Sequence, residues 1–227
     1  MRRKTIILSL GGSIIIPDRI NTAYLKKFRS LVLRYVRAGH RFVIVTGGGD
    51  ICRHYQHGAS AVSHVSAADL DWIGIAATRL NAELVRSVFG PHAYGGVLGN
   101  PMRRVATAKR IIVGSGWRPG HSSDKDAVML AKVYQAKTVI NMSNIPYVYT
   151  ADPRKSSTAK PIKRMSWGGL LKLTGSTWRP GAHVPFDPEA SKLARKLGLR
   201  VVVCRGTDLK NLGSVITGKK FRGTVIA

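Results

Sequence analysis

Three glycine-rich segments are the part of this chain best suited to chemistry. They are Gly11-Gly12-Ser13, Gly47-Gly48-Gly49 and Gly114-Ser115-Gly116, and each follows a short apolar run. Glycine lets backbone N–H groups approach an anion closely, and a helix that begins after it adds its positive end. None of the three has the Walker A pattern or Gly-x-Gly-x-x-Gly, which argues against P-loop and dinucleotide-binding proteins. Together they predict a polyphosphate site.

Several polar residues could complete that site. Arg53 follows the second glycine segment at a distance that would turn its guanidinium back toward a phosphate, although it could equally be a solvated arginine. Asp69 and Asp71 stand near a predicted helix start, where an acid either caps the helix or accepts hydrogen bonds from ribose hydroxyls. Ser122 and Ser123 precede another helix and offer two hydroxyls, whereas a plain cap needs only one.

Other kinds of site have no support in the sequence. The seven histidines and two cysteines show no spacing typical of metal ligands, so no protein-held metal site is predicted. The two cysteines are expected to be reduced thiols. A Gly-x-Ser-x-Gly elbow is missing, which gives acyl transfer no support.

The elements that must position these residues alternate between strands and helices. Apolar runs predict strands at 5–10, 41–46, 109–113, 137–142, 200–204 and 223–226. Helical patterns lie between them, at 21–38, 67–89, 124–134, 187–197 and 208–216. This alternation predicts an α/β fold, a three-layer sandwich with a mostly parallel central sheet and helices on both faces. We expect one domain, residues 1–227, with lobes of about 1–135 and 136–227. The glycine segments then meet at the carboxyl ends of the strands.

The charge of the chain is unusual. Thirty-seven Lys and Arg face eleven Asp and Glu, a formal net charge of +26 that is spread along the whole sequence. Such a balance favours polyanionic partners and predicts non-specific nucleic-acid binding; the alternative is a basic composition on an ordinary fold. Apolar stretches stay far below the ~20 residues of a membrane span, so we expect a cytoplasmic protein with no membrane partner.

Five motifs follow one another along the chain: Leu10-Gly11-Gly12-Ser13, Gly47-Gly48-Gly49-Asp50-Ile51-Cys52-Arg53, Asp71-Trp72-Ile73-Gly74 with Thr78-Arg79-Leu80-Asn81-Ala82, Pro119-Gly120-His121-Ser122-Ser123-Asp124, and Val148-Tyr149-Thr150-Ala151-Asp152-Pro153. In type and order they resemble the amino acid kinase superfamily, and within it uridylate kinases of the archaeal type. The resemblance covers essentially the whole chain.

The resemblance implies a kinase that transfers the ATP γ-phosphoryl group to UMP with Mg²⁺, often as a hexamer built as a trimer of dimers. The first lobe would hold the acceptor and the second ATP. The implied UMP residues are Gly48, Asp71, Thr78, Trp117, Arg118, Pro119, Gly120, His121, Ser122 and Ser123. The implied ATP residues are Gly12, Ser13, Gly49, Arg53, Ser143, Asn144, Tyr149 and Asp152.

Phosphoryl transfer requires two anions held in line and neutralisation of the charge that develops. Gly12, Ser13, Arg53 and Lys192, with Mg²⁺, are the predicted catalytic groups. Asp187 joins them as a residue that could orient the lysine or the metal, or that could simply cap the helix beginning at Pro188.

Two departures from the family pattern bear on the catalytic rate. Many relatives carry a lysine where this chain has Ser9, and an aspartate where it has Pro146. One alternative is another kinase of the superfamily, such as isopentenyl phosphate kinase, although His54 and His57 do not match its histidine pattern. The other is a weakly catalytic nucleotide- or nucleic-acid-binding homologue, which the net charge and the two departures favour.

Overall fold

The structure, a computed structural model, describes residues 4–177 and 184–227. Its centre is an eight-stranded sheet in the order β3-β4-β2-β1-β5-β9-β10-β8. The strands are β1 (Thr5–Leu10), β2 (Arg41–Thr46), β3 (Ala93–Leu98), β4 (Ile111–Gly114), β5 (Thr138–Ser143), β8 (Arg164–Met165), β9 (Arg200–Arg205) and β10 (Thr224–Ile226). The first six in spatial order are mutually parallel, and β10 runs antiparallel to β9. A small separate ribbon pairs β6 (Val148–Tyr149) with β7 (Pro161–Ile162).

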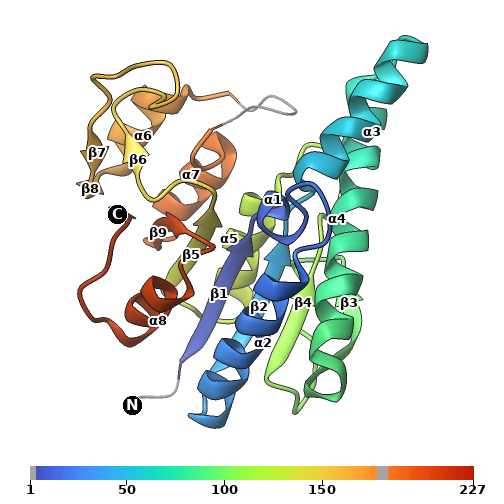
Figure 1. Cartoon of the computed structure of the whole chain (residues 1–227), viewed down its shortest axis with the longest axis vertical. Helices are drawn as coiled ribbons and strands as arrows, with labels where there is room; N and C mark the ends of the chain where they lie inside the picture. Colours follow the sequence, from blue (N-terminus) through green and yellow to red (C-terminus); the bar gives the residue numbers. More distant parts are fainter. Residues whose placement is uncertain (1–3, 178–183) are drawn as a thin grey trace.

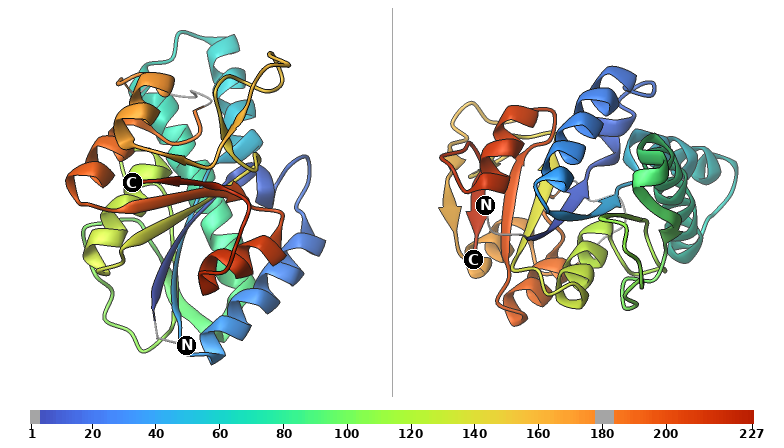
Figure 2. Two further views of the ribbon diagram at one scale, coloured as in Figure 1. Left: turned by 90° about the vertical axis from the view of Figure 1, so that its left-hand side faces the viewer. Right: turned by 90° about the horizontal axis from the view of Figure 1, so that it is seen from below.

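Helices cover both faces of this sheet, as the predicted three-layer sandwich requires. The right-hand view of Figure 2 looks along the strands, with α2 and α8 on one side and α5 and α7 on the other. The helices are α1 (Gly12–Ile15), α2 (Thr22–Arg37), α3 (Gly49–Val62), α4 (Ala67–Phe89), α5 (Ser123–Val133), α6 (Trp167–Thr174), α7 (Pro188–Lys196) and α8 (Leu209–Thr217), with a 3₁₀ turn at Gly90–His92.

The core lies in two halves, one on each face of the sheet. Along β1, Ile6, Leu8 and Leu10 pack into the half that includes Phe28 of α2, whereas Ile7 packs into the half below α5 and α7. Strands buried on both faces have nearly continuous apolar sequences, which is why these runs were recognisable as strands.

Local signals in the sequence set most helix ends. Asn21 Oδ1 accepts a hydrogen bond from the Tyr24 amide (3.1 Å), and Asp208 Oδ1 accepts one from the Asn211 amide (3.0 Å), so the predicted helix starts are confirmed. Gly39, with φ of 92°, follows the end of α2. Only glycine adopts this left-handed conformation at little cost.

The elements that the sequence did not predict have weak local signals. The edge strand β3 contains Gly95 and Gly96 and shifts register against β4. Glycine is depleted in strands because it leaves no side chain to pack, so this strand has no clear apolar pattern. The strands β7 and β8 are two residues long, and α6 was also missed.

A single sheet joins the two halves of the chain. The central strand β1 pairs with β2 on one side and with β5 on the other, with Ile7 opposite Val139. The hairpin of α3 and the first turns of α4 extends beyond the sheet (Figure 1). Within residues 4–177 and 184–227, no helix is both long and apolar enough to cross a membrane.

Candidate active site

A cleft of about 280 Å³ lies where β2 and β4 end and α3, α5 and α7 begin. Of the predicted site residues it is lined by Gly48, Gly49, Arg53, Asp71, Thr78, His121, Ser122, Ser123 and Asp187. It also contains Gly116 of the third glycine-rich segment and six residues that were not among the predicted site residues: Cys52, Gln56, Gly74, Ile75, Asp124 and Val184. The fold therefore gathers segments from both halves of the sequence at one edge of the sheet.

The first two glycine segments touch each other at this edge. A side-chain carbon at Gly12 would lie 2.5 Å from the Gly47 carbonyl oxygen, and one at Gly49 would lie 2.5 Å from the Gly12 carbonyl carbon. Gly49 also has φ of +68°. Any larger residue at Gly12 or Gly49 would push the two loops apart, so the close approach of their backbones requires glycine.

Helix α4 holds the second glycine segment in place through hydrogen bonds. The buried Asn81 side chain donates from Nδ2 to the carbonyl oxygens of Gly47 (2.8 Å) and Gly48 (3.2 Å). Thr46 Oγ1 donates to the Thr78 carbonyl oxygen (2.8 Å). Asn81 belongs to the Thr-Arg-x-Asn motif, and that motif was the only signal in the sequence for its supporting position.

Arg53 lies one turn into α3 and points back to the first glycine segment. Its Nη2 donates to Ser13 Oγ (3.2 Å) and forms an ion pair with Asp50. The guanidinium is therefore held beside the contact of the two glycine loops, as the sequence predicted, and is not simply solvated.

Asp69 and Asp71 have different partners. Ser66 Oγ accepts a hydrogen bond from the Asp69 amide (3.1 Å) and donates to Asp69 Oδ2 (2.6 Å), so these two residues cap α4. Asp71 takes no part in the cap: its Oδ2 accepts a hydrogen bond from the Gly120 amide (2.8 Å). The cap-only interpretation therefore holds for Asp69 and not for Asp71, which ties α4 to the loop after β4.

That loop, residues 115–122, is ordered by its own side chains and by α4. Thr78 Oγ1 accepts a hydrogen bond from the Gly116 amide (2.8 Å). Arg118 stacks over the Trp117 ring at 4.2 Å, and Trp117 meets the His121 ring edge-on at 5.1 Å. Trp117, Arg118, Pro119 and Gly120 do not line the cleft, but they frame the loop that brings His121 into it.

His121 is neutral at pH 7. Burial, with the nearby Lys125 and Arg118 cations, lowers the pKa of His121 to about 4. Its Nδ1 lies 3.3 Å from Asp126 Oδ1, and burial raises the pKa of that carboxyl group to about 7. Burial therefore favours the uncharged form of both side chains.

Ser122 and Ser123 divide the two tasks that the sequence left open. Ser122 Oγ accepts a hydrogen bond from the Lys125 amide (3.2 Å) and caps α5. Ser123 is the first residue of α5 and lines the cleft, where no side-chain hydrogen bond to it forms among the described residues. Its hydroxyl and the free N–H groups of α5 remain available to an anion.

Two carboxylates that the fold brings together form the floor of the cleft. Asp124 Oδ1 accepts hydrogen bonds from Ser9 Oγ (2.9 Å) and Asn141 Nδ2 (3.3 Å), and Asp124 Oδ2 accepts one from the Asp187 amide (3.3 Å). Burial and the Asp187 carboxylate raise the pKa of Asp124 to about 7. The only signal in the sequence for Asp124 was its place after Ser122 and Ser123.

Of the two roles that the sequence offered for Asp187, the structure shows the helix cap. Its Oδ1 caps α7 by accepting a hydrogen bond from the Ala190 amide (2.6 Å). Its Oδ2 is buried and has no protein partner in the part of the chain that the structure describes. Burial raises the pKa of Asp187. An acceptor left open in this way, next to a second carboxylate, suits a divalent cation.

The structure does not bring Lys192 to this group, although the sequence placed it among the catalytic residues. On α7 the buried positions are Pro188, Ala190, Ser191 and Ala194, whereas Lys192 is exposed. Its Nζ pairs with Glu189 Oε1 at 2.7 Å. The helical period turns the ammonium away from the cleft, and we remove Lys192 from the candidate site.

The four residues predicted to line an adenosine pocket lie outside the cleft. Ser143 ends β5, next to the end of β1 in the sheet, and Asn144 follows it. Tyr149 pairs with Pro161 in the small ribbon. Asp152 accepts hydrogen bonds from Arg154 Nε (3.1 Å) and Nη2 (3.0 Å). Only Ser143 and Asn144 are therefore at the same edge of the sheet as the glycine segments.

Similar proteins agree in family, length and fold. The model described as the amino acid kinase family matches residues 4–205. The uridylate kinase of Methanospirillum hungatei JF-1 is 34% identical over 225 residues, which cover 98% of this chain and 94% of that protein. The uridylate kinase of Pyrococcus abyssi is 31% identical, with 97% and 98% covered. The crystal structure of uridylate kinase from Archaeoglobus fulgidus superposes with a TM-score of 0.83 at 31% identity, covering 99% of this chain and 100% of that one.

Proposed function

The chain belongs to the amino acid kinase family, and from this premise we propose that it is an enzyme that transfers the γ-phosphoryl group of ATP to UMP. The observation that supports this most is the cleft in which a double glycine loop, the Arg53 guanidinium and the Asp71 carboxylate face one space. Relatives of nearly equal length named uridylate kinase support UMP as the acceptor.

The acceptor would lie between α4 and the loop before α5. Asp71 uses Oδ2 for the Gly120 amide, so Oδ1 is available to accept hydrogen bonds from the ribose hydroxyls of UMP. The UMP phosphate would bind at the N-terminus of α5, against the Ser123 hydroxyl and the backbone of Gly48. The neutral side chain of His121 would border the acceptor site on this side and would add no charge next to the UMP phosphate.

ATP would enter from the side of the second lobe. Its phosphates would meet the backbone N–H groups of Gly12, Ser13 and Gly49 and the Arg53 guanidinium, while Ser143 and Asn144 would border the adenosine. Tyr149 and Asp152 lie farther along this side and would reach the nucleoside only from the small ribbon.

Asp124 and Asp187 fit the Mg²⁺ that ATP carries. Carboxylate oxygens are the ligands that Mg²⁺ prefers, and the buried Asp187 Oδ2 is without a partner among the described residues. When bound, Mg²⁺ would neutralise negative charge that develops on the phosphoryl group. No group of three or more His, Cys, Asp or Glu in residues 4–177 and 184–227 could hold a metal by itself, so the phosphates would supply the remaining ligands.

The residues of this chain would then act by position and charge. The glycine loops hold the two anions in line, and Arg53 stabilises charge as the γ-phosphoryl group moves. Asn81 and Thr46 keep the second loop in place. Phosphoryl transfer needs little covalent help from the protein. Contacts that position the two anions and stabilise charge are therefore the kinds of contact that the reaction requires.

We also propose that the enzyme is an oligomer, up to a trimer of dimers. The α3–α4 hairpin exposes large apolar side chains, with Tyr55 at 66%, Trp72 at 53% and Leu80 at 61% exposed. These side chains come from two helices that pack against each other, and contiguous exposed apolar patches are typical of protein–protein interfaces.

A coupled assay of ADP release tests the proposed reaction. With Mg²⁺ and ATP, we expect turnover with UMP that exceeds turnover with CMP or AMP. Faster turnover of isopentenyl phosphate would instead identify another kinase of the family. Binding of nucleotides without ADP release would favour a weakly catalytic homologue.

A further inference from the structure

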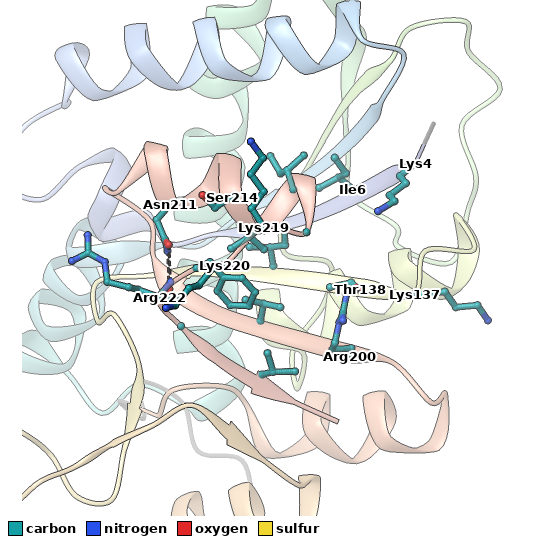
Figure 3. A pocket seen from close by; sticks show the side chains of 18 of the residues that line it. Lys4, Ile6, Lys137, Thr138, Arg200, Asn211, Ser214, Lys219, Lys220 and Arg222 are labelled. Carbon is teal, nitrogen blue, oxygen red and sulfur yellow. Dashed lines mark hydrogen bonds between the residues drawn. The ribbon is translucent and has the colours of Figure 1, made fainter. Parts of the chain in front are cut away.

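A second and larger hollow lies at the other edge of the sheet. It is reached from the amino ends of the parallel strands, at Lys4 before β1, Lys137 before β5 and Arg200 at the start of β9. The cleft described above lies at the carboxyl ends of the same strands. Figure 3 shows Lys4, Lys137 and Arg200 at one end of the hollow and Asn211 with Arg222 at the other. We call it the basic groove; its volume is about 1810 Å³.

The ratio of basic to acidic residues is higher in the groove than in the chain as a whole. Nine of its described lining residues are Lys or Arg, and one, Asp208, is acidic. In the full sequence the corresponding numbers are 37 and 11. Arg222 Nη2 already engages Asp208 Oδ2 at 2.8 Å. Among the residues that the structure describes, the other eight cations form no ion pair. Their mutual repulsion disfavours an empty groove and favours an anion in it.

Apolar and aromatic surface accompanies this charge. The lining includes Ile140, Val202 and Val225 of the sheet and the half-buried side chains of Tyr147 and Phe221. Cations that follow a phosphate backbone, combined with aromatic rings on which bases stack, are characteristic of sites for single-stranded nucleic acid. In a duplex the bases already stack on one another, so a duplex could contact the cations of the groove but could not stack its bases on the aromatic rings.

The size of the groove favours a polymer over a single nucleotide. Pockets for small ligands enclose about 300–1,000 Å³, and the basic groove exceeds that range. A second copy of this chain is disfavoured as the occupant, because a two-fold contact would place the same cations opposite one another. We propose that the basic groove binds a segment of single-stranded nucleic acid, independently of the kinase cleft.

Anisotropy titrations with fluorescent U15 and dT15 test this proposal on the full-length protein. The groove variant carries Lys137→Gln, Lys219→Gln and Lys220→Gln, all exposed lining residues. The control variant carries Lys26→Gln, Lys27→Gln and Lys172→Gln, which are equally exposed on α2 and α6 and remove the same charge.

We expect the groove variant to bind at least about tenfold more weakly at 0.1 M salt. The slope of log affinity against log salt should fall by up to about 2, since each phosphate contact contributes about 0.7 with a single strand. The control variant should change both quantities much less, and both variants should keep the parent's kinase turnover. Phe221→Leu should weaken binding of the single strands while leaving that of a 15-base-pair duplex unchanged.

Three results would overturn the proposal. Equal losses in the two lysine variants would mean that the net charge acts diffusely. Tighter binding of the duplex than of the single strands would exclude base stacking. Full competition by micromolar UTP would mean a site for a mononucleotide. If the triple variant does not fold, the single variants, each checked by thermal melting, provide the same comparison of salt slopes.

Discussion

At the residue scale, two acids of α4 show how position decides a role. Asp69 and Asp71 are two residues apart, yet the first is bonded to Ser66 in the helix cap and the second to the Gly120 amide beside the cleft. The helical period of 3.6 residues places them on different sides of α4. The same amino acid therefore caps the helix at one position and ties α4 to the loop before α5 at the other.

We expect Asp71→Asn to raise the KM for UMP about 10- to 100-fold and to leave the KM for ATP unchanged. A charge-assisted hydrogen bond to a ligand contributes roughly 1.5–3 kcal/mol. Asp69→Asn is the matched control, which should lower thermal stability slightly without affecting either KM. Initial-rate kinetics measure both constants; an unchanged KM for UMP in the Asp71 variant would show that this residue only holds the loop.

Ser9 and Asp124 give a second comparison at this scale. Ser9, where many relatives have lysine, donates to Asp124 Oδ1 across 115 residues of sequence. Asp124 is therefore placed to hold a lysine introduced at position 9, whereas Pro146 does not line the cleft.

We therefore expect Ser9→Lys alone to increase kcat by about tenfold or more, since a held cation stabilises the developing charge. Ser9 is 5% exposed, so the added length could disturb packing. Ser9→Met has a similar length without charge and separates the two effects. Adding Asp124→Asn to Ser9→Lys should abolish the gain. A Lys variant no faster than the Met variant would mean that Arg53 already supplies enough positive charge.

At the element scale, the N-terminus of α7 meets an acid in the first turn of α5. Asp124 belongs to the first turn of α5, and Asp187 caps α7 while its amide binds Asp124. Two carboxylates so close together, both with raised pKa values, destabilise the folded chain when they ionise. A cation bound between the two helices, together with phosphates, would offset this destabilisation.

This arrangement predicts a dependence of stability on pH. Asp124 has a pKa of about 7 in the folded chain and the ordinary value near 3.8 when unfolded. Between pH 4 and 7 the folded chain therefore binds more protons at Asp124 than the unfolded chain does. The stabilisation from Asp124 is complete below its pKa in the unfolded chain and is lost as the pH rises through its pKa in the folded chain. Asp124→Asn should reduce that loss by at least about 1 kcal/mol.

Urea unfolding of the parent and of Asp124→Asn at pH 4.5 and pH 7.5 measures the effect. The difference between the two proteins isolates Asp124 from Asp126, whose pKa burial also raises to about 7. Parallel changes in both proteins would show that Asp124 does not titrate in this range.

At the scale of the whole molecule, one sheet separates the candidate active site from the basic groove. The candidate active site lies at the carboxyl ends of the parallel strands, whereas the basic groove lies at their amino ends. The α3–α4 hairpin projects away from the sheet (Figure 1). Apolar side chains on its two helices, among them Tyr55 and Trp72, are exposed. Nucleotide chemistry, nucleic-acid binding and self-association can therefore use different surfaces.

We expect the hairpin to hold the proposed oligomer together. Trp72→Asp with Leu80→Asp should reduce the sedimentation coefficient to that of a smaller species, because charges buried in an apolar interface are costly. Met102→Asp, at a residue that is 61% exposed and lies outside the hairpin, is the control and should leave the assembly intact. Sedimentation velocity measures the outcome, and an unchanged coefficient in the double variant would place the interface elsewhere.

The sequence by itself determined the features that depend on neighbouring residues. Apolar runs predicted the buried strands, and Asn21 and Asp208 predicted helix starts. Each signal is local: a cap needs a partner three residues away, and a parallel strand covered by helices needs an apolar side chain at nearly every position. The order of these elements was also enough to predict three layers.

Only the tertiary structure decided which distant groups meet. Four segments of the chain supply Ser9, Asp124, Asn141 and Asp187, and no local pattern links these residues. They meet because β1 and β5 are neighbours in the sheet. The exposed direction of Lys192 follows from which face of α7 is buried. The basic groove has the same origin, because its cations are scattered along the sequence and the fold gathers their long side chains around one hollow.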